Sequence, residues 1–528
     1  MSRFFNTAGA IRRDDHYYIE PLERFDLDEM LRLIDQKKYF VLHAPRQTGK
    51  TTYLRALMEY LNKQGKYTCL LINVEAAQAA RENVKEGIRA ILNRLAKNAF
   101  DFLNDSFFVK KDNWIQILNN SGEFSALQDA LTLWCKKSKK PIVLFVDEID
   151  SMVGDTLISV LRQLRSGYEN RPALFPQSII LCGIRDVRDY RIHSDKEKTV
   201  ITGGSAFNVK AKSLKLGNFT LQEIEKLYRQ HTEETGQIFN NEVFPLVWEL
   251  TEGQPWLVNA LAYEACFEMK EGQDRNNEIT VGMIEQAKEN LILRRETHLD
   301  QLSDKLKEER VRRVIEPILV GSPEGETIPT DDIDYVIDLG LVKREGEIRI
   351  SNRIYQEVIP RELTYSTQLT LHQEKAWYVD PDGRLNMDKL LTAFQEYFRR
   401  SFEHWVGGFD YREAGPQLLL QAFLQRIVNG GGHVEREYGL GRQRTDILVQ
   451  WPYKGGSQEA VIELKLRYGD LETTIEKGLE QTFEYMDKCG TREGYLLIFN
   501  RSPQVTWEEK IFKQVRNFKD MDIAIYGM

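Results

Sequence analysis

An acid and an amine interrupt an apolar stretch near the carboxyl end of the sequence. In AVIELKL (460–466), Glu463 and Lys465 are two residues apart. Successive side chains of a strand alternate between its two faces, so both charged groups are expected on one face, among apolar neighbours that indicate burial. Because an isolated buried charge is costly, the two must pair with each other or serve a site.

A second acid lies in the preceding apolar run. Asp446 is part of RTDILVQW (444–451), and PYKGGSQ joins this run to the next, which gives the spacing D-x16-E-x-K. Two adjacent strands would bring both carboxylates to one sheet edge, where they could share a divalent cation through oxygen ligands. Lys465 would then position the nucleophilic water or stabilise charge on a scissile phosphate. The alternative is a half-exposed Glu463–Lys465 salt bridge worth at most about 1 kcal/mol, which leaves Asp446 unexplained.

Two helical segments flank these strands and carry further polar side chains. EAGPQLLLQAFLQRI (413–427) begins with Glu413, and GLEQTFEYMDK (478–488) places Gln481 and Tyr485 four residues apart, on one face of a helix. Both helices can therefore line the same cleft as the charged strands.

A separate stretch predicts a phosphate-binding loop. APRQTGKTT (44–52) fits G-x-x-x-x-G-K-[ST] except that Ala44 replaces the first glycine. It follows the apolar run YFVLH (39–43) and opens a helix, whose positive end can bind phosphate. Lys50 would reach the β- and γ-phosphates of ATP, and Thr51 would ligate Mg²⁺. The loop residues expected to bind nucleotide are Pro45, Arg46, Gln47, Thr48, Gly49, Lys50, Thr51 and Thr52. The alternative is a chance turn before a helix.

Two acids follow another buried strand. PIVLFVDEID (141–150) places Asp147 at the carboxyl end of an apolar run, where ligand sites of α/β proteins lie. Asp147 is expected to hold Mg²⁺, and Glu148 to orient or deprotonate the water that attacks the γ-phosphate. The alternative, a strand that merely ends in solvent, is less favoured once a phosphate loop is present.

Composition limits the classes of protein. The chain of 528 residues, with 42% hydrophobic and 29% charged residues, is long enough for several folded domains. The net charge of −8 gives no global sign of nucleic-acid binding, although a local basic patch can still occur. Five scattered cysteines without a CxxC pair argue against a zinc site and a disulfide scaffold. No apolar run could span a bilayer, so a cytoplasmic protein without a membrane partner is expected.

Hydrophobic periodicity predicts the order of the domains. The apolar runs 67–75, 141–150 and 178–186 alternate with helical segments, which predicts an α/β fold with a doubly wound parallel sheet. Amphipathic helices follow, and then two helices with a β-hairpin that suggest a winged helix. The acidic TDDIDYVID segment favours a packing module over a DNA reader there. The predicted parts are a P-loop core (1–205), a helical lid (206–300), a winged-helix-like domain (301–365), a helical connector (366–404) and an α+β domain (405–528).

Residues 1–360 resemble the AAA-like P-loop ATPases of prokaryotes related to the STAND and archaeal ATPase groups. The resemblance is carried by APRQTGKTT, LFVDEID, LCGIRDVRDYR, FTLQEIEKL and TEGQPWLVNALA. It implies that Gly183 and Arg185 occupy the sensor strand, with Arg185 on the γ-phosphate, and that the Gly253–Gln254–Pro255 segment belongs to a lid that reports the nucleotide state. Arginines that could act as a finger toward a neighbouring subunit, each with a solvated helix face as the favoured alternative, are Arg162, Arg165 and Arg171.

Residues 405–528 resemble the PD-(D/E)XK nuclease superfamily. The resemblance implies that Asp446 is the first acid of the motif and that Glu463 and Lys465 are its E-x-K pair, with Thr445 where the proline would stand. It also implies that Glu413 is the helical acid and that Gln481 and Tyr485 form the Q-x-x-x-Y helix of RecB-like members. The implied ligands for Mg²⁺ or Mn²⁺ at this site are Glu413, Asp446 and Glu463.

Basic and aromatic residues near the second site are candidates for nucleic-acid contacts. Arg436, Arg442 and Arg444 are possible phosphate clamps, although a solvated strand face is the stronger alternative for each alone. The aromatic residues that could stack on bases, with core packing as the favoured alternative, are Trp405, Tyr411 and Tyr438.

Together these patterns predict an ATPase that regulates a metal-dependent nuclease acting on DNA or RNA, in prokaryotic defence or repair by analogy. The alternative is a STAND-like signalling or scaffold NTPase that forms a homo-oligomer on ATP binding and whose nuclease-like tail binds without cutting.

Overall fold

The computed structural model describes most of the chain. The residues described are 3–528 except 187–190, 195–198, 295, 321–327, 364–376, 407–419, 421–422, 425–431, 441–442, 468, 501 and 503–504. They form two compact units, one of Met1–Gln301 with Pro329–Tyr355, and one of Leu302–Ile328 with Gln356–Met528. The five-part division expected from the sequence stays a prediction.

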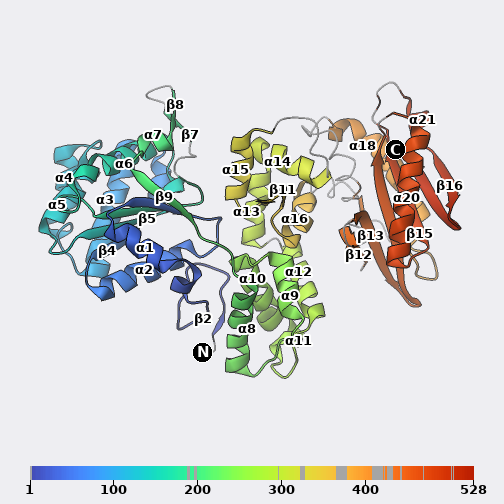
Figure 1. The fold of residues 1–528 in the computed structure, drawn as a ribbon, viewed down its shortest axis with the longest axis horizontal. Helices are drawn as coiled ribbons and strands as arrows, with labels where there is room; N and C mark the ends of the chain where they lie inside the picture. Colours follow the sequence, from blue (N-terminus) through green and yellow to red (C-terminus); the bar gives the residue numbers. More distant parts are fainter. Residues whose placement is uncertain are drawn as a thin grey trace. The chain divides into compact units, whose positions relative to one another are not determined.

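A five-stranded parallel sheet is the centre of the first unit (Figure 1). Its strand order is β4-β5-β6-β3-β9, and every neighbouring pair in it is parallel. The strands are β3 (Tyr39–His43), β4 (Thr68–Asn73), β5 (Ile142–Asp147), β6 (Ser178–Gly183) and β9 (Lys210–Lys215). The continuous apolar runs form these strands because both faces of the sheet are covered. The predicted α/β fold with a parallel sheet is confirmed.

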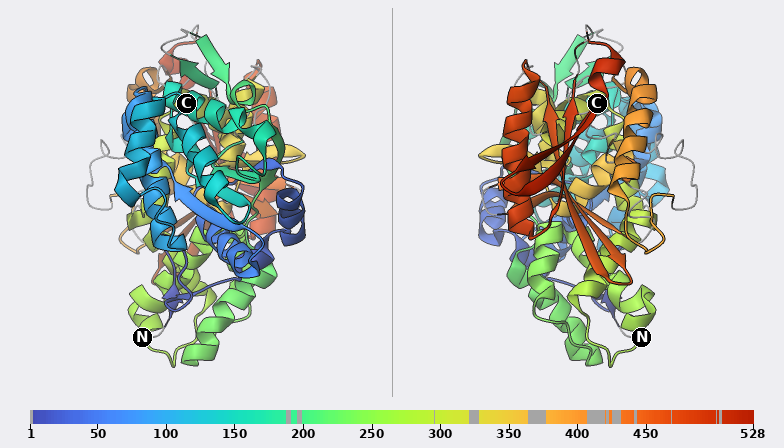
Figure 2. Two further views of the ribbon diagram at one scale, coloured as in Figure 1. Left: turned by 90° about the vertical axis from the view of Figure 1, so that its left-hand side faces the viewer. Right: turned by 90° about the vertical axis from the view of Figure 1, so that its right-hand side faces the viewer.

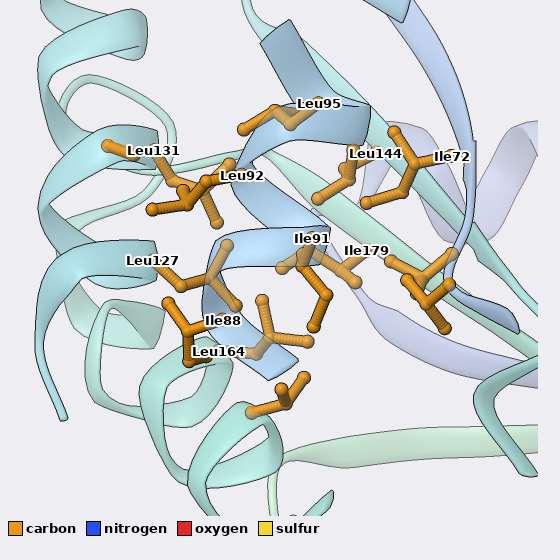
Figure 3. Close-up of a cluster of buried hydrophobic side chains, with 14 of the residues drawn as sticks. Ile72, Ile88, Ile91, Leu92, Leu95, Leu127, Leu131, Leu144, Leu164 and Ile179 are labelled. Carbon is orange, nitrogen blue, oxygen red and sulfur yellow. The ribbon is translucent and has the colours of Figure 1, made fainter. Parts of the chain in front are cut away.

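Helices cover both faces of this sheet because strand side chains alternate. Phe40 and Leu42 of β3 face α1 (Leu27–Asp35) and α2 (Lys50–Gln64) in one buried cluster. The other face packs against helices whose bounds are α3 (Val84–Leu103), α4 (Asn113–Ser121), α5 (Ala126–Lys137) and α6 (Gly154–Ser166). Figure 3 shows Ile88, Ile91, Leu92 and Leu95 of α3 between this sheet face and the leucines of α5 and α6. The two layers fix the ends of the strands, where the predicted phosphate loop lies.

Helices follow the sheet along the chain, as the amphipathic spacing predicted. The first, α8 (Leu221–Thr235), begins with a capping box between Thr220 and Glu223. The next helices are α9 (Val243–Thr251), α10 (Pro255–Tyr263), α11 (Lys270–Gln273), α12 (Val281–Arg294), α13 (Thr297–Leu306) and α14 (Glu309–Val320). Then come α15 (Thr330–Asp338), the antiparallel hairpin of β10 (Val342–Glu345) and β11 (Glu347–Ile350), and α16 (Arg353–Leu363). The hairpin turns at Gly346, whose φ of +84° suits glycine.

Short elements complete the first unit. They are the parallel pair β1 (Phe4–Phe5) and β2 (His16–Tyr17), the antiparallel pair β7 (Arg191–Ser194) and β8 (Thr199–Thr202), and α7 (Gly203–Ala206). The pairing of β1 with β2 holds the amino-terminal segment as a closed loop.

A six-stranded mixed sheet forms the second unit, seen in the right-hand view of Figure 2. Its order is β12-β13-β14-β15-β17-β16, with parallel pairs on both sides of β15 and antiparallel pairs elsewhere. The strands are β12 (His433–Leu440), β13 (Gln443–Tyr453), β14 (Gly456–Leu466), β15 (Glu493–Phe499), β16 (Lys513–Phe518) and β17 (Met521–Gly527). The expected hairpin between the two charged strands is β13–β14.

Helices pack on both faces of this mixed sheet. α20 (Leu471–Cys489) packs on the face that carries Leu448 and Val461, and α18 (Met387–Val406) packs on the face that carries Ile447 and Ile462. The helix α21 (Trp507–Lys510) is short. The sequence predicted residues 366–404 as a connector, but α18 supplies core residues such as Leu390 and Phe394. The sequence predicted the helix, and the structure adds the sheet face against which it packs.

No helix in the described part of the chain is both long enough and apolar enough to cross a membrane.

Candidate functional site

The phosphate loop joins β3 to α2 through a strained turn. Gly49 caps α2 with φ of +92°, and Gln47 also has a positive φ of +57°. Within the turn, Thr48 Oγ1 donates a hydrogen bond to the carbonyl of Pro45 at 2.8 Å. The turn therefore presents the amino terminus of α2 at the carboxyl edge of the sheet, where an anion is favoured.

The lysine of the loop lies within the turn itself. Lys50 Nζ donates to the carbonyls of Ala44 and Pro45, each at 2.8 Å, and the residue is buried. A buried ammonium group needs such partners. Phosphate oxygens, which carry more charge than carbonyls, are stronger acceptors for the same amine. The replacement of glycine by Ala44 does not prevent this closed loop.

Thr51 and Asp147 meet although they are far apart in the sequence. Thr51 Oγ1 donates to Asp147 Oδ2 at 2.7 Å, and Asp147 is 0% exposed at the end of β5. The amide of Glu148 donates to Asp147 Oδ1 at 3.0 Å. A hydroxyl and a carboxylate at one point are oxygen donors of the kind that Mg²⁺ prefers together with phosphates. The donor set at this point fits the expected magnesium ion.

Glu148 has the environment of a proton acceptor. Burial raises the pKa of its carboxyl, and the charges of Asp150 and Asp147 raise the pKa further. A carboxylate with a raised pKa is a stronger base than an exposed one. The residue also has a left-handed backbone, with φ of +57°, a conformation found more often at functional sites than elsewhere.

Arg185, the expected γ-phosphate sensor, contacts α15. Its Nε lies 3.4 Å from Asp338 Oδ2, and its guanidinium group lies over the ring of Tyr335, 4.9 Å from the centroid. His43, beside the loop, is 3.9 Å from the same carboxylate. Burial lowers the pKa of His43 to about 4, so this histidine is neutral at neutral pH and does not form an ion pair there. The sensor arginine is thus engaged by an acid from α15.

The three arginines considered as fingers differ in their surroundings. Arg171 donates to the carbonyls of Tyr168 and Lys37 and stacks on the Tyr168 ring, so its contacts hold the local chain together. Arg165 donates to the Ser205 carbonyl at 3.0 Å, and Arg162 is exposed on α6. Their role toward a second subunit stays a prediction.

At the second site, Glu463 and Lys465 form a direct pair. Lys465 Nζ donates to Glu463 Oε1 at 2.7 Å, and the Glu463 side chain is only 4% exposed while that of Lys465 is 24% exposed. Both belong to the face of β14 that α20 covers, as the alternation with Val461 requires. The buried pair expected from the sequence is therefore present.

Asp446 lies in β13, directly before Ile447, whose Cα partner on β14 is Ile462. The backbone register thus brings Asp446 next to Glu463. Tyr411, Glu413 and Arg442 lie outside the described residues. The structure describes the backbone but not the side chains of Trp405, Arg436, Tyr438, Arg444 and Asp446.

The Q-x-x-x-Y residues of α20 have different environments. Tyr485 is buried against the sheet, and Gln481 is exposed. The described side chains contain no group of three or more acids, histidines or cysteines able to hold a metal ion. Since two of the three predicted ligands are outside that set, the metal site stays a prediction.

Comparison with known families finds a match for the part of the chain that contains the first site. A family described as "AAA-like domain" matches residues 6–359. The chain belongs to this AAA-like family. The matched span contains the phosphate loop, Asp147, Glu148 and Arg185, and it ends before the mixed sheet of the second unit.

Several solved structures resemble the AAA-like part of the chain. A Walker-type ATPase of Pyrococcus abyssi matches with 16% identity over 67% of this chain and 99% of that one, with a TM-score of 0.45. A variant of RuvB from Thermotoga maritima matches with 11% identity over 63% and 95%, with a TM-score of 0.33. Cdc6p of Pyrobaculum aerophilum matches with 12% identity over 64% and 92%, with a TM-score of 0.35. A search of curated proteins found no match.

Sequence reasoning missed a pocket of the AAA-like domain beside the phosphate loop. Its walls come from the loop itself, from the amino-terminal segment, including Thr7 and Ile11, and from Trp256 and Asn259 of α10. Trp256 Nε1 donates to the Thr7 carbonyl at 2.8 Å, which joins two of these walls. The amino-terminal segment carries no motif, so only the predicted lid motif around Pro255 could have indicated the pocket.

Arg24 was also missed, although it touches the phosphate loop. It donates to the carbonyls of Thr48 and Gly217, both at 2.8 Å, and lies over the Phe219 ring. Burial lowers the pKa of Arg24 to about 10, so the group remains cationic at neutral pH. It joins the loop of the AAA-like domain to the segment that leads into α8.

The two glycines that cap α2 provide a matched test of the phosphate loop. Gly49 and Gly65 both have a positive φ, +92° and +76°, so alanine at either position costs about 1–2 kcal/mol of stability. A Cβ at Gly49 would lie 2.7 Å from Arg24 Nη1, whereas at Gly65 its nearest neighbour is Lys140 Nζ at 3.7 Å. We expect both variants to show a similarly lowered melting temperature, but only Gly49→Ala to lose binding of a fluorescent ATP analogue. Equal nucleotide binding by the two variants would contradict a role for the loop.

Proposed function

We propose that the AAA-like domain binds and hydrolyses ATP with Mg²⁺, and that its nucleotide state regulates a metal-dependent nuclease centre in the mixed-sheet unit. The ATPase part rests above all on the Thr51–Asp147 hydrogen bond, which brings the loop and the acid strand to one point beside Lys50. The nuclease part rests on the buried Glu463–Lys465 pair next to the backbone of Asp446.

The residues of the first site have separate tasks in this proposal. Lys50 binds the β- and γ-phosphates, and Thr51 and Asp147 would hold Mg²⁺, which neutralises phosphate charge when bound. Glu148 accepts the proton of the attacking water, for which its raised pKa suits it. Arg185 binds the γ-phosphate, and in doing so it would exchange Asp338 for a phosphate oxygen. That exchange gives α15 a different environment with and without ATP.

The second site would act on a phosphodiester of DNA or RNA. Glu463 and Asp446 would hold Mg²⁺ or Mn²⁺, with Glu413 as the further acid implied by the nuclease resemblance; the bound ion supplies Lewis-acid activation. Lys465 orients the attacking water or stabilises charge on the scissile phosphate. Its amine lies 2.7 Å from Glu463 and is partly exposed, so it can reach both the acid and a substrate.

A second candidate function is a switch whose tail binds without cutting. The observation that favours it is the direct Lys465–Glu463 contact, because an ion pair satisfies both charges without a cation. The Arg185–Asp338 contact suits a switch equally well. In that case ATP binding would change the oligomeric state, and the mixed sheet would bind a partner only.

The pH dependence of hydrolysis tests the role of Glu148. Below its raised pKa the carboxyl is protonated and cannot accept a proton, so kcat should fall as the pH falls, with a midpoint above the ordinary value of 4.5. Glu148→Gln should lower kcat by about 100-fold or more and abolish that acid limb. Steady-state phosphate release measured between acid and neutral pH checks both effects.

Binding of ATP by Glu148→Gln is the control, and it should equal that of the wild type. An unchanged acid limb in this variant would remove Glu148 from the mechanism.

A cleavage assay tests the second site. Single- and double-stranded DNA and RNA are incubated with the full chain, Mg²⁺ or Mn²⁺, with and without ATP. We expect the wild type to cut at least one of these, and Lys465→Ala to cut about 100-fold more slowly. Lys454→Ala, which removes an exposed lysine from the turn between the same two strands, should cut like the wild type.

Failure to cut any substrate, combined with ATP-dependent oligomers in size-exclusion chromatography, would favour the switch instead. Cutting that Lys465→Ala leaves unchanged would place the nuclease chemistry elsewhere.

A further inference from the structure

The pocket beside the phosphate loop is lined by three polar side chains with unused hydrogen-bonding atoms, those of Asn259, Gln47 and Arg24. Asn259 on α10 is 6% exposed, and its Oδ1 is buried with no hydrogen-bond partner among the described atoms. Gln47 lines the pocket from the phosphate loop, and its Oε1 is likewise buried with no hydrogen-bond partner among the described atoms. Native proteins rarely leave a buried polar atom unsatisfied, so each exception points to a missing partner.

The orientation of the Asn259 amide is fixed by its other end. Asn259 Nδ2 donates to the Pro255 carbonyl at 2.7 Å, one turn earlier on α10. This bond uses the amide nitrogen as a donor and leaves the oxygen as the unsatisfied atom. The unsatisfied atoms of Asn259 and Gln47 are therefore acceptors, whereas Arg24 Nε is a donor, so a ligand that fits the Asn259 oxygen must present an N–H or O–H donor to it.

The walls suit a flat apolar ring. Ile19, Leu227 and Trp256 line the pocket with Pro255. The wall positions are also held in place, because the Ile11 amide donates to Thr52 Oγ1 at 3.2 Å and Trp256 Nε1 donates to the Thr7 carbonyl. Since Gly49 and Thr52 belong to the same pocket, a ring bound here can be joined to phosphates on the loop.

We propose that Asn259 determines base specificity by accepting a hydrogen bond from the exocyclic 6-amino group of adenine. Guanine and hypoxanthine carry a carbonyl oxygen at that position, which would face the Asn259 oxygen as a second acceptor without a proton between them. The pocket thus selects a 6-amino purine nucleotide over 6-oxo purine nucleotides. This inference rests on the proposed nucleotide binding and adds the residue that reads the base.

Inosine triphosphate is a direct probe because it differs from ATP only in having a 6-oxo group in place of the 6-amino group, with the accompanying hydrogen on N1. We expect the wild type, measured by calorimetry with Mg²⁺, to bind ATP at least about tenfold more tightly than inosine triphosphate, equivalent to about 1.4 kcal/mol. Asn259→Leu should bring the ratio of the two dissociation constants close to one.

Asn218 provides a matched control outside the pocket. It donates to the Glu252 carbonyl at 3.0 Å in the segment before α8 and does not line the pocket. Asn218→Leu should keep the wild-type preference for ATP. Thermal unfolding of each variant shows whether it is folded, and the ratio of two affinities in one folded protein is insensitive to the active fraction.

The outcomes separate this inference from the proposed function. Equal binding of both nucleotides by the wild type, or an unchanged ratio in Asn259→Leu, would overturn the role of Asn259 while leaving nucleotide binding intact. Absence of binding to either nucleotide by the folded wild type would overturn the proposed ATP site, and this inference with it.

Discussion

The free-energy cost of burying a carboxylate determines which groups surround the acid in both candidate sites. Asp147 is 0% exposed and Glu463 is 3% exposed, and a carboxylate in such an interior is tolerated only with specific partners. At Asp147 the partners are the Thr51 hydroxyl and the Glu148 amide, and at Glu463 the partner is the Lys465 amine. Asp147 ends β5, which has a parallel neighbour on each side, and Glu463 lies in β14, which has one parallel neighbour. Helices cover both faces of each sheet. We propose that these acids are the oxygen ligands of metal ions in two phosphate reactions.

The order of the strands explains why three motifs of the first unit converge. β6 lies between β3, which leads into the phosphate loop, and β5, which ends at Asp147. The carboxyl end of β6 is therefore flanked by both motifs, and it contacts each of them: the Ala44 amide donates to the Gly183 carbonyl, and the Ile184 amide donates to Asp150. Arg185 follows directly. The strand order therefore places the expected sensor residue next to a strand end that both motifs flank.

The sequence allowed prediction of what depends on local spacing. The apolar runs gave the parallel sheet, the loop pattern gave the turn at Gly49, and two-residue alternation gave the shared face of Glu463 and Lys465. Side-chain exposure on α20 was less predictable. Helical spacing placed Gln481 and Tyr485 on one face of the helix. In the structure Tyr485 is buried and Gln481 is exposed, so the face of α20 that contacts the sheet includes only the tyrosine.

Contacts between distant parts of the chain could not be predicted. The Arg185–Asp338 contact joins residues 153 positions apart, and Trp256 meets Thr7 across 249 positions. Neither pair has a motif of its own. The packing of α18 on the mixed sheet could not be predicted for a related reason, because the helical pattern of residues 366–404 does not show which sheet the helix will cover.

The most direct test of the account is to locate manganese by anomalous diffraction in crystals grown with Mn²⁺ and a non-hydrolysable ATP analogue. We expect one ion bonded to Thr51 Oγ1 beside the phosphates and a second ion bonded to the Glu463 carboxylate. A manganese ion at Thr51 alone, with the Lys465 amine still on Glu463, would contradict the nuclease centre. Absence of manganese from both positions, with the nucleotide bound elsewhere, would contradict the account as a whole.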